Sequence, residues 1–350
     1  MMKFHPHYLS KTLIMSLLGL MMSLPSHGGT GMPAEPLPDE AAPSALPQIT
    51  VKPVAEAQLV HALQTGSRSA LARAVAEGAS IEMELAGGDR PLLAVVRAGR
   101  DDLAAECLDW SADCSARGAD SVDPLTLAVL RKNHSLAERL LQAGADPNAP
   151  LPGPAPETVR SHFEAPWFVS QLKYDPGITP LMLAAVQGDE DMVRLLLRHG
   201  GRSSQRTKRY TTDALTLACR ASQMRIGQML VGRDPDHPQK QKLIVSLSKQ
   251  QVTLFRGDEV VMTSRCSTGR KGHATPKGEF LVTTKLRNWT STIYKVPMPY
   301  MMRLNSSEIG LHQGVVPGYP ASHGCIRLPA GKAAAFFKVV RVGDLVVINN

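Results

Sequence analysis

A repeat of about 33 residues runs through the first two thirds of this 350-residue chain. Similar segments begin at residues 91 (PLLAVV), 124 (PLTLAV), 180 (PLMLAA) and 214 (ALTLAC). In the middle units a polar turn, a second apolar run and a glycine follow, as in LAERLLQAG at 136–144. Proline suits the first turn of a helix and glycine ends one, so each unit predicts two short helices. Neither helix can bury its apolar face alone, so neighbouring units must stack.

The period and the segment TPLMLAA at 179–185 resemble the ankyrin repeats. The step from residue 124 to residue 180 is longer than one period, and the Pro-rich segment 149–175 explains the excess as an insertion that loops out. We therefore expect about five repeats over residues 57–235, forming an all-α solenoid. The resemblance implies a scaffold that binds a protein partner and has no chemistry of its own, and the sequence does not identify that partner.

The pattern changes near residue 240 from helical to strand-like. Strands are predicted from short apolar or alternating runs at 243–247, 252–255, 260–263 and 345–348. Residues 256–258 (RGD) predict a hairpin turn, and only 331–340 has a clear helical pattern. We therefore expect a second, mostly β domain over residues 240–350, so that the chain is multidomain.

Charge is distributed unevenly between the two regions. The whole chain has 39 Lys and Arg against 31 Asp and Glu, a net charge of +8. Residues 241–350 hold 15 of these basic residues and only 5 of the acidic ones, whereas residues 1–240 hold 24 and 26. A basic domain of this kind indicates an anionic partner such as a nucleic acid, a membrane surface or the cell wall. The plainer interpretation is a solvated basic face.

The N-terminal segment predicts export. Residues 1–28 combine basic residues, a 13-residue apolar run at 12–24, and the small residues Ser26 and Gly28, as a cleavable signal peptide does. The run is too short for a bilayer core of about 30 Å, which needs about 20 residues. Residues 29–56 are rich in Pro and Ala and predict a flexible linker. We expect cleavage after Gly28, and no membrane span in the mature protein.

Two short motifs in the second domain combine the parts of a cysteine nucleophile. Residues 311–314 are LHQG, and residues 322–328 are SHGCIRL. A cysteine nucleophile needs a base to take its proton and backbone donors to hold the oxyanion. His312 can serve as that base for Cys325, and Gly324 lets the backbone turn tightly beside the sulfur.

These motifs resemble the signature of the L,D-transpeptidases, whose catalytic domain is of the YkuD type. The block STG at 267–269, followed by TPKGEF at 275–280, matches the same family, and so does the order of the motifs. The resemblance implies that Cys325 attacks a peptidoglycan tetrapeptide stem and forms a thioester. His312 would act as base, and the amine of a second stem would resolve the thioester into a 3→3 cross-link.

The resemblance also implies roles for residues around the nucleophile. Ser322, His323 and Gly324 would shape the site and its oxyanion hole. Arg327 and Tyr300 would bind substrate, since a guanidinium suits a carboxylate. No metal or organic cofactor is implied, and the expected location is the periplasm.

Two alternatives concern the histidines. Nine residues separate His312 from Ser322, fewer than is usual in the family, so either His312 or His323 could contact the sulfur. A zinc site formed by His312, His323 and Cys325 has suitable ligand types but lacks an evident fourth ligand.

The other cysteines are expected to be structural. Cys107, Cys114 and Cys219 lie in the repeats, and Cys266 ends a predicted strand. Because the chain has five cysteines, complete disulfide pairing would leave one thiol free. A regulatory disulfide between Cys266 and Cys325 is the less favoured alternative.

Three functions agree with these observations. The first is a periplasmic transpeptidase with an ankyrin arm. The second uses the same acyl-enzyme for hydrolysis, as an L,D-carboxypeptidase, or for attaching or releasing a wall-bound protein. The third is an ankyrin scaffold tethered to the cell wall. The expected partners are peptidoglycan stem peptides and an unidentified protein, and no nucleic acid.

Overall fold

The computed structural model describes residues 52–350 except 238, 239 and 308. The predicted signal peptide (1–28) and most of the predicted linker therefore lie outside the described residues. Helix α1 (Lys52–Thr65) begins before residue 56, where the linker was predicted to end. Pro53 did not prevent this earlier start, because a proline is tolerated in the first turn of a helix. No helix in the described part is long and apolar enough to cross a bilayer.

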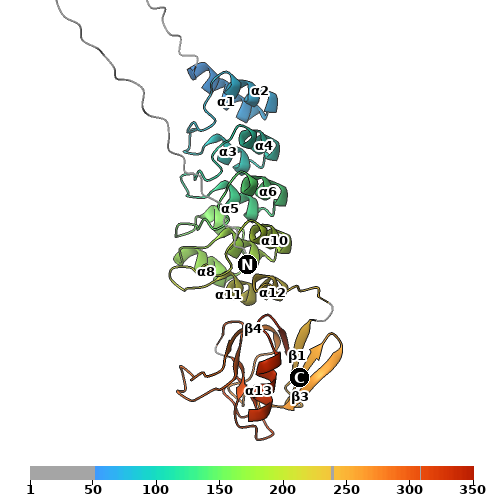
Figure 1. The fold of residues 1–350 in the computed structure, drawn as a ribbon. Helices are drawn as coiled ribbons and strands as arrows, with labels where there is room; N and C mark the ends of the chain where they lie inside the picture. Colours follow the sequence, from blue (N-terminus) through green and yellow to red (C-terminus); the bar gives the residue numbers. More distant parts are fainter. Residues whose placement is uncertain (1–51, 238–239, 308) are drawn as a thin grey trace, which may run out of the picture. The chain divides into compact units, whose positions relative to one another are not determined.

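Residues 52–230 form the predicted stack of helical pairs, which confirms the fold expected for the first region. The helices after α1 are α2 (Arg68–Ala76), α3 (Pro91–Arg97), α4 (Asp101–Asp109), α5 (Pro124–Leu130), α6 (His134–Gln142), α7 (Glu157–Arg160), α8 (Pro166–Tyr174), α9 (Pro180–Gln187), α10 (Glu190–Arg198), α11 (Ala214–Arg220) and α12 (Met224–Leu230). One row of contacts follows α3, α5, α9 and α11, and a second row follows α2, α4, α6, α10 and α12 (Figure 1).

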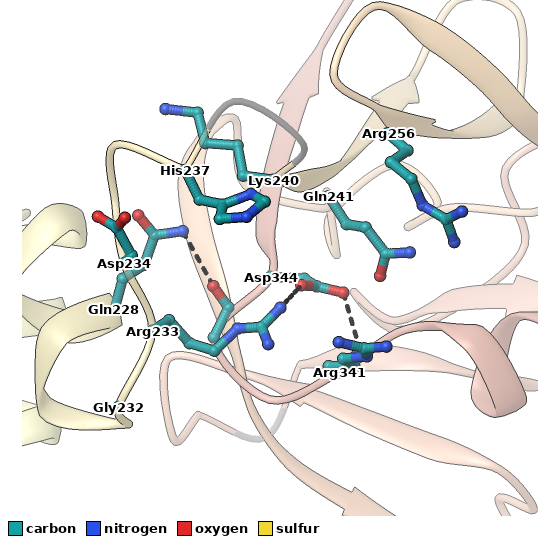
Figure 2. Close-up of a pocket in the computed structure, with 11 residues that line it drawn as sticks. Gln228, Gly232, Arg233, Asp234, His237, Lys240, Gln241, Arg256, Arg341 and Asp344 are labelled. Carbon is teal, nitrogen blue, oxygen red and sulfur yellow. Dashed lines mark hydrogen bonds and ion pairs between the residues drawn. The ribbon is translucent and has the colours of Figure 1, made fainter.

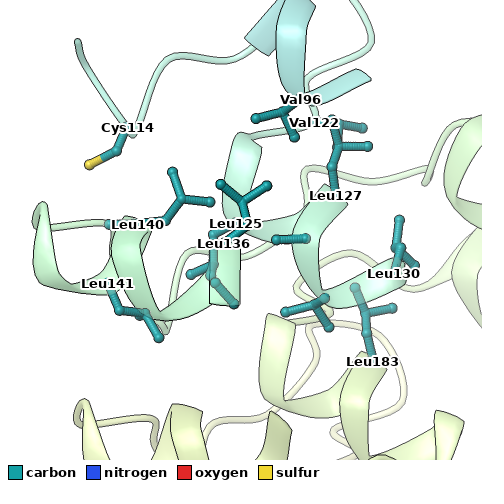
Figure 3. Close-up of a cluster of buried hydrophobic side chains, with 14 of the residues drawn as sticks. Val96, Cys114, Val122, Leu125, Leu127, Leu130, Leu136, Leu140, Leu141 and Leu183 are labelled. Atoms are coloured by element: carbon teal, nitrogen blue, oxygen red, sulfur yellow. The ribbon is translucent and has the colours of Figure 1, made fainter. Parts of the chain in front are cut away.

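Local sequence explains where these helices begin and what they bury. The Asp123 carboxylate accepts a hydrogen bond from the amide of Thr126 at the start of α5, at 2.8 Å. Thr179 caps α9 in the same way. Figure 3 shows Leu125 of α5 beside Leu136 and Leu140 of α6, so each pair contributes aliphatic side chains to a continuous core. The low aromatic content therefore does not prevent close packing.

The insertion between α6 and α9 contains α7 and α8. Its two ends meet, because the amide of Leu151 donates to the carbonyl of Ile178 at 2.8 Å and that of Gly177 donates to Leu151 at 3.2 Å. Phe168 of α8 is fully buried. The insertion thus leaves the repeats and returns to them at one place, and its helix α8 packs against them.

The second region is a mixed sheet with one helix, as the strand-like pattern predicted. Its elements are β1 (Gln241–Ser246), β2 (Gln251–Arg256), β3 (Glu259–Arg265), β4 (Gly278–Leu286), β5 (Met301–Leu304), β6 (Gly310–Gln313), β7 (Ile326–Leu328), α13 (Ala330–Val339) and β8 (Leu345–Asn349). The strand order is β3-β2-β1-β8-β4-β5-β6-β7. The sequence did not predict β4 to β7, three of which have only three or four residues and therefore carry little periodic signal.

The segment around β8 contacts the last repeat. Gln228 donates to the carbonyl of Gly343 at 3.1 Å, and Arg233 pairs with Asp344 at 3.1 Å (Figure 2). Asp344 is almost completely buried, and this burial raises the pKa of its carboxyl group. A Cβ on Gly227 would lie 2.4 Å from Leu281 Cδ1, so α12 approaches β4 closely. The cavity of about 410 Å³ in Figure 2 is thus lined in part by an ion pair that joins two structural elements.

Candidate active site

A cavity of about 570 Å³ contains most of the predicted site residues. Those that line it are His312, Ser322, His323, Cys325 and Arg327. The remaining wall comes from the segment 289–298, from Ile309 and from residues 313–315. The structure therefore brings the two sequence motifs to one site.

Strand pairing explains how the motifs meet. Strands β6 and β7 are parallel, with His312 opposite Arg327 and Leu311 opposite Ile326. Leu311 and Ile326 are fully buried in the core. Because side chains alternate between the faces of a strand, His312 and Arg327 share the opposite face. Cys325 immediately precedes β7, two positions before Arg327, and its side chain reaches the same cavity.

His312 is arranged as a neutral base. Its side chain is buried, and Nδ1 donates a hydrogen bond to the Gln313 carbonyl at 2.7 Å. A neutral imidazole carries one proton, so Nε2 retains a lone pair that can accept another. Burial, assisted by the nearby Arg327, lowers the pKa of His312 below the usual value of 6.5. The ring is therefore neutral at neutral pH, with Nε2 free of a proton, as a general base must be.

His323 is held differently. Its Nε2 accepts a hydrogen bond from Arg270 Nη2 at 2.7 Å, so the proton of the neutral ring lies on Nδ1. The ring also packs against His273 and Tyr294, with centroid separations of 4.7 and 4.6 Å. Desolvation, followed by the charge of Arg270, lowers its pKa. Because Arg270 occupies the lone pair of Nε2, the geometry favours His312 over His323 as the base.

The turn before Cys325 is closed by a serine. Ser322 Oγ donates to the Cys325 carbonyl at 2.6 Å and accepts from the Gly324 amide at 3.1 Å. Gly324 has a φ of 114°, in the left-handed region that favours glycine. The Gly324 amide was expected to help form an oxyanion hole, but in this structure it is engaged by Ser322. The role of Ser322 is thus to hold the turn.

The block 267–280 supports the same turn from the other side. Thr275 Oγ1 donates to the Gly324 carbonyl at 2.8 Å and accepts from the Gly269 amide at 2.8 Å. The Thr268 carbonyl accepts from the amide of Ser322 at 2.9 Å. Sequence reasoning recognised this block only by resemblance and missed its function. The available signal was a Thr and a Gly in an otherwise polar loop, and spacing alone does not connect these residues to Cys325.

Tyr300 does not line the cavity, contrary to the sequence-based expectation that it binds substrate. It has a left-handed φ of 59°, and its ring packs against Phe337 of α13 at a centroid separation of 5.6 Å. Tyr294 lines the cavity instead. The two tyrosines flank the same Pro-rich segment, so their positions in the sequence gave no basis for choosing between them.

The rim of the cavity is apolar and exposed. Ile293, Val296 and Val315 are 61%, 47% and 76% exposed, respectively, although each lines the cavity. Arg327 lies further in, and its side-chain stem packs closely on Gly314, where an added Cβ would be 3.0 Å from Arg327 Cδ. The site can therefore offer apolar contacts at its entrance and a cation near the nucleophile.

The other cysteines are buried, as predicted, and unsuited to nucleophilic chemistry. Burial raises the pKa of Cys107, Cys219 and Cys266 to about 12 and also raises that of Cys114. A thiol with a raised pKa stays protonated at neutral pH, and the thiolate is the reactive form. Within the described residues no cysteine is disulfide-bonded, and no group of three or more His, Cys, Asp or Glu could hold a metal ion.

Comparisons with known proteins match both regions of the chain, the helical repeats and the sheet domain. Residues 240–348 match the L,D-transpeptidase catalytic domain, residues 158–241 match three copies of the ankyrin repeat, and residues 123–150 match one further copy. The chain is 30% identical over 118 residues to L,D-transpeptidase 1 of Mycobacterium tuberculosis, covering 29% of this chain and 47% of that protein. It thus spans about half the length of the curated relatives it matches.

Solved structures of L,D-transpeptidases are similar to about a third of this chain. The crystal structure of Mycobacterium tuberculosis L,D-transpeptidase 1 is 29% identical, with a TM-score of 0.28 over 31% of this chain and 61% of that one. An L,D-transpeptidase from Mycobacterium smegmatis is 23% identical, with a TM-score of 0.30 over 32% of this chain and 59% of that one. With the matches to the family models on either side of residue 240, the chain joins ankyrin repeats to a C-terminal domain of the L,D-transpeptidase catalytic family.

Proposed function

We propose that the protein is an exported L,D-transpeptidase that cross-links peptidoglycan through a cysteine acyl-enzyme. The observation that carries this proposal is the state of His312, whose Nδ1 is fixed by Gln313 while its lowered pKa leaves Nε2 unprotonated beside the cavity of Cys325. The catalytic-domain match supports the reaction class. The predicted signal peptide at residues 1–28 supports the periplasm as the location.

The first half-reaction forms a thioester. His312 Nε2 takes the proton of the Cys325 thiol, and the thiolate attacks the carbonyl carbon of the third residue of a tetrapeptide stem. The negative charge that develops on the carbonyl oxygen needs donors other than the engaged Gly324 amide, and the His323 amide in the same turn is one candidate. The carbon–nitrogen bond then breaks, and the departing D-alanine takes its proton from His312.

In the second half-reaction an amine is the nucleophile and Cys325 becomes the leaving group. An amine of a second stem gives its proton to His312 and attacks the thioester carbon. The new amide bond forms, the carbon–sulfur bond breaks, and Cys325 recovers its proton. Arg327 supplies a positive charge for a stem carboxylate at the inner wall, and the apolar rim would contact the acceptor strand.

The test uses the purified mature protein and tetrapeptide muropeptides, with products identified by mass spectrometry. We expect 3→3-linked dimers and released D-alanine. Tripeptides without dimers would instead identify a hydrolase, and the absence of any product from a folded protein would contradict the proposal. The Cys325→Ala protein serves as the matched control.

A further inference from the structure

A basic and aromatic surface lies on the repeats, outside the candidate active site. It consists of six exposed side chains from the end of α8 and from the loop between α10 and α11. We call it the basic–aromatic patch, and its members are Lys173, Tyr174, Arg206, Lys208, Arg209 and Tyr210. The insertion contributes two of them and the loop the other four, so the patch depends on both segments.

The cations of the patch lie against aromatic rings. The Arg209 guanidinium is 5.9 Å from the centroid of the Tyr174 ring and 5.4 Å from that of Tyr210. Lys173 Nζ is 5.3 Å from the Tyr174 centroid. A cation over an aromatic face is stabilised without losing its charge. Tyr174 and Tyr210 remain 48% and 50% exposed, so much of their ring surface is open to a ligand.

Few carboxylates neutralise this charge. In the described part of the chain, the one ion pair made by a patch cation joins Arg206 to Asp213, at 3.9 Å. Asp175 lies nearby in the chain but is buried, and its carboxylate accepts from the backbone amide of Arg209 at 2.7 Å. The first 240 residues have slightly more acidic than basic side chains, so the patch is a local concentration of positive charge.

The patch is also fixed in place. Gln171 donates to the second oxygen of Asp175 at 3.1 Å, and the amide of Lys208 donates to the carbonyl of Pro176 at 2.8 Å. The first bond fixes the Asp175 side chain that accepts from the Arg209 amide, and the second joins the loop to residue 176, so the loop is held against the end of the insertion and the two tyrosines keep their spacing. A surface that is ordered before binding loses less conformational entropy when a ligand arrives.

We propose that the basic–aromatic patch binds the carboxylate-bearing glycan strands of peptidoglycan and holds the polymer while the catalytic domain acts. The choice of polymer rests on the proposed function. Exposed tyrosine faces suit sugar rings, whose C–H groups can pack flat on them, and the flanking cations suit the carboxylates of the stem peptides. An acidic protein would use the cations but has less need of two half-exposed tyrosine rings.

The experiment measures sedimentation of the protein with purified peptidoglycan sacculi, in a full-length mature Cys325→Ala background that cannot turn over. One variant carries Arg206→Glu, Lys208→Glu and Arg209→Glu, and a second carries Tyr174→Ser and Tyr210→Ser. The matched control reverses the same number of charges at exposed positions elsewhere on the repeats, namely Arg73→Glu, Lys132→Glu and Arg198→Glu. The basic catalytic domain supplies a constant background in all of them.

We expect both patch variants to bind sacculi about tenfold more weakly than the control variant. In a chain with Cys325 intact, the tyrosine variant should keep its turnover of soluble muropeptides and lose activity only on intact sacculi. Equal losses in the patch and control variants would overturn the inference, and so would unchanged binding by the tyrosine variant. Retained binding by a chain that makes no product would refute the proposed activity but not the patch.

Discussion

The helical repeats and the sheet domain both bury polar side chains, but these side chains have different partners. In the repeats, Asp123, Thr179 and Asp189 each accept a hydrogen bond from an amide in the first turn of their own helix. The caps made by Asp123 and Thr179 act locally, whereas the Asp189 carboxylate also bonds His134 of the neighbouring helix α6 at 2.9 Å. The repeats therefore distribute their polar contacts along the stack.

In the sheet domain, buried polar groups converge on one turn. Thr268 and Thr275 bond to the segment 322–325, Ser322 closes it from within, and Ser267 exchanges backbone hydrogen bonds with Arg327 beside it. Groups that share a network do not act independently. The comparison teaches that a polar substitution should affect stability in the repeats and geometry at the nucleophile in the sheet domain.

The largest expected effect is at the nucleophile. Cys325→Ala should abolish release of D-alanine, because no other described thiol lies in the cavity. Intact-mass spectrometry with a tetrapeptide should show an acyl adduct on the unchanged protein and none on this variant. Cys266→Ala is the matched control, since Cys266 is equally a buried cysteine of the same domain but lies in its core. A folded Cys266→Ala protein without an adduct would contradict the assignment.

The next effect is at the base. His312→Ala should slow acylation by about 10²–10⁴-fold, the usual contribution of a positioned general base. His323→Ala should be milder, because Arg270 already occupies its Nε2. Single-turnover kinetics of the two variants make the comparison, with circular dichroism to verify folding. A larger loss in His323→Ala would transfer the role of base to His323.

The pH dependence of acylation tests the same distinction between His312 and His323. Burial lowers the pKa of His312, so its neutral form persists to lower pH than that of an ordinary histidine. The rate of acylation should therefore fall on the acidic side only below about pH 6.5, the value for an unperturbed histidine. In the His323→Ala protein this fall in rate, the acid limb of the pH–rate profile, should occur at the same pH. An acid limb that moves in that variant would show that His323 controls the titration.

A smaller effect is expected at Thr275. Thr275→Val keeps the shape of the side chain but leaves the Gly324 carbonyl without its donor, so the turn should lose its fixed geometry. We expect acylation to slow about tenfold, equivalent to about 1.4 kcal/mol, while Thr275→Ser stays close to the unchanged rate. Measuring the melting temperature as well separates geometry from stability. A loss of stability without a loss of rate would mean that Thr275 stabilises the fold, as the capping residues do, and does not position the nucleophile.

The smallest effect on chemistry is expected at a cap. Thr179→Ala removes the acceptor for the Met182 amide and should lower the free energy of unfolding by about 1 kcal/mol. The rate of acylation per folded molecule should not change. Denaturant unfolding and single-turnover kinetics on the same preparation test both statements. A reduced rate in the folded protein would mean that the stability of the repeats influences the geometry of the site.

The sequence predicted the two fold classes well, because the repeats have a clear period and strands β1, β2, β3 and β8 have apolar or alternating runs. It placed His312 and Cys325 in one site, and the structure agrees. It could not predict β5 to β7, whose few residues are set by pairing across the sheet. It named Tyr300 for the site, whereas Tyr294 lines the cavity, because the left-handed backbone at Tyr300 is a tertiary property.

Contacts between side chains that are distant in the sequence could not be predicted either. The Arg270–His323 bond joins positions 53 residues apart, and Thr275 reaches Gly324 across 49 residues. No local pattern reports such a pair. The basic–aromatic patch likewise combines an insertion with a loop from a later repeat, and only the fold brings them together.

Gly269 limits the substitutions that the sheet domain can tolerate. A Cβ at this position would lie 2.0 Å from the His273 carbonyl oxygen and 2.6 Å from the Thr275 amide nitrogen, and both atoms belong to the backbone. Even alanine would therefore push the threonine away from the turn that it supports. A descendant that kept its cysteine and both histidines but replaced this glycine would keep every residue of the proposed chemistry and still be catalytically silent.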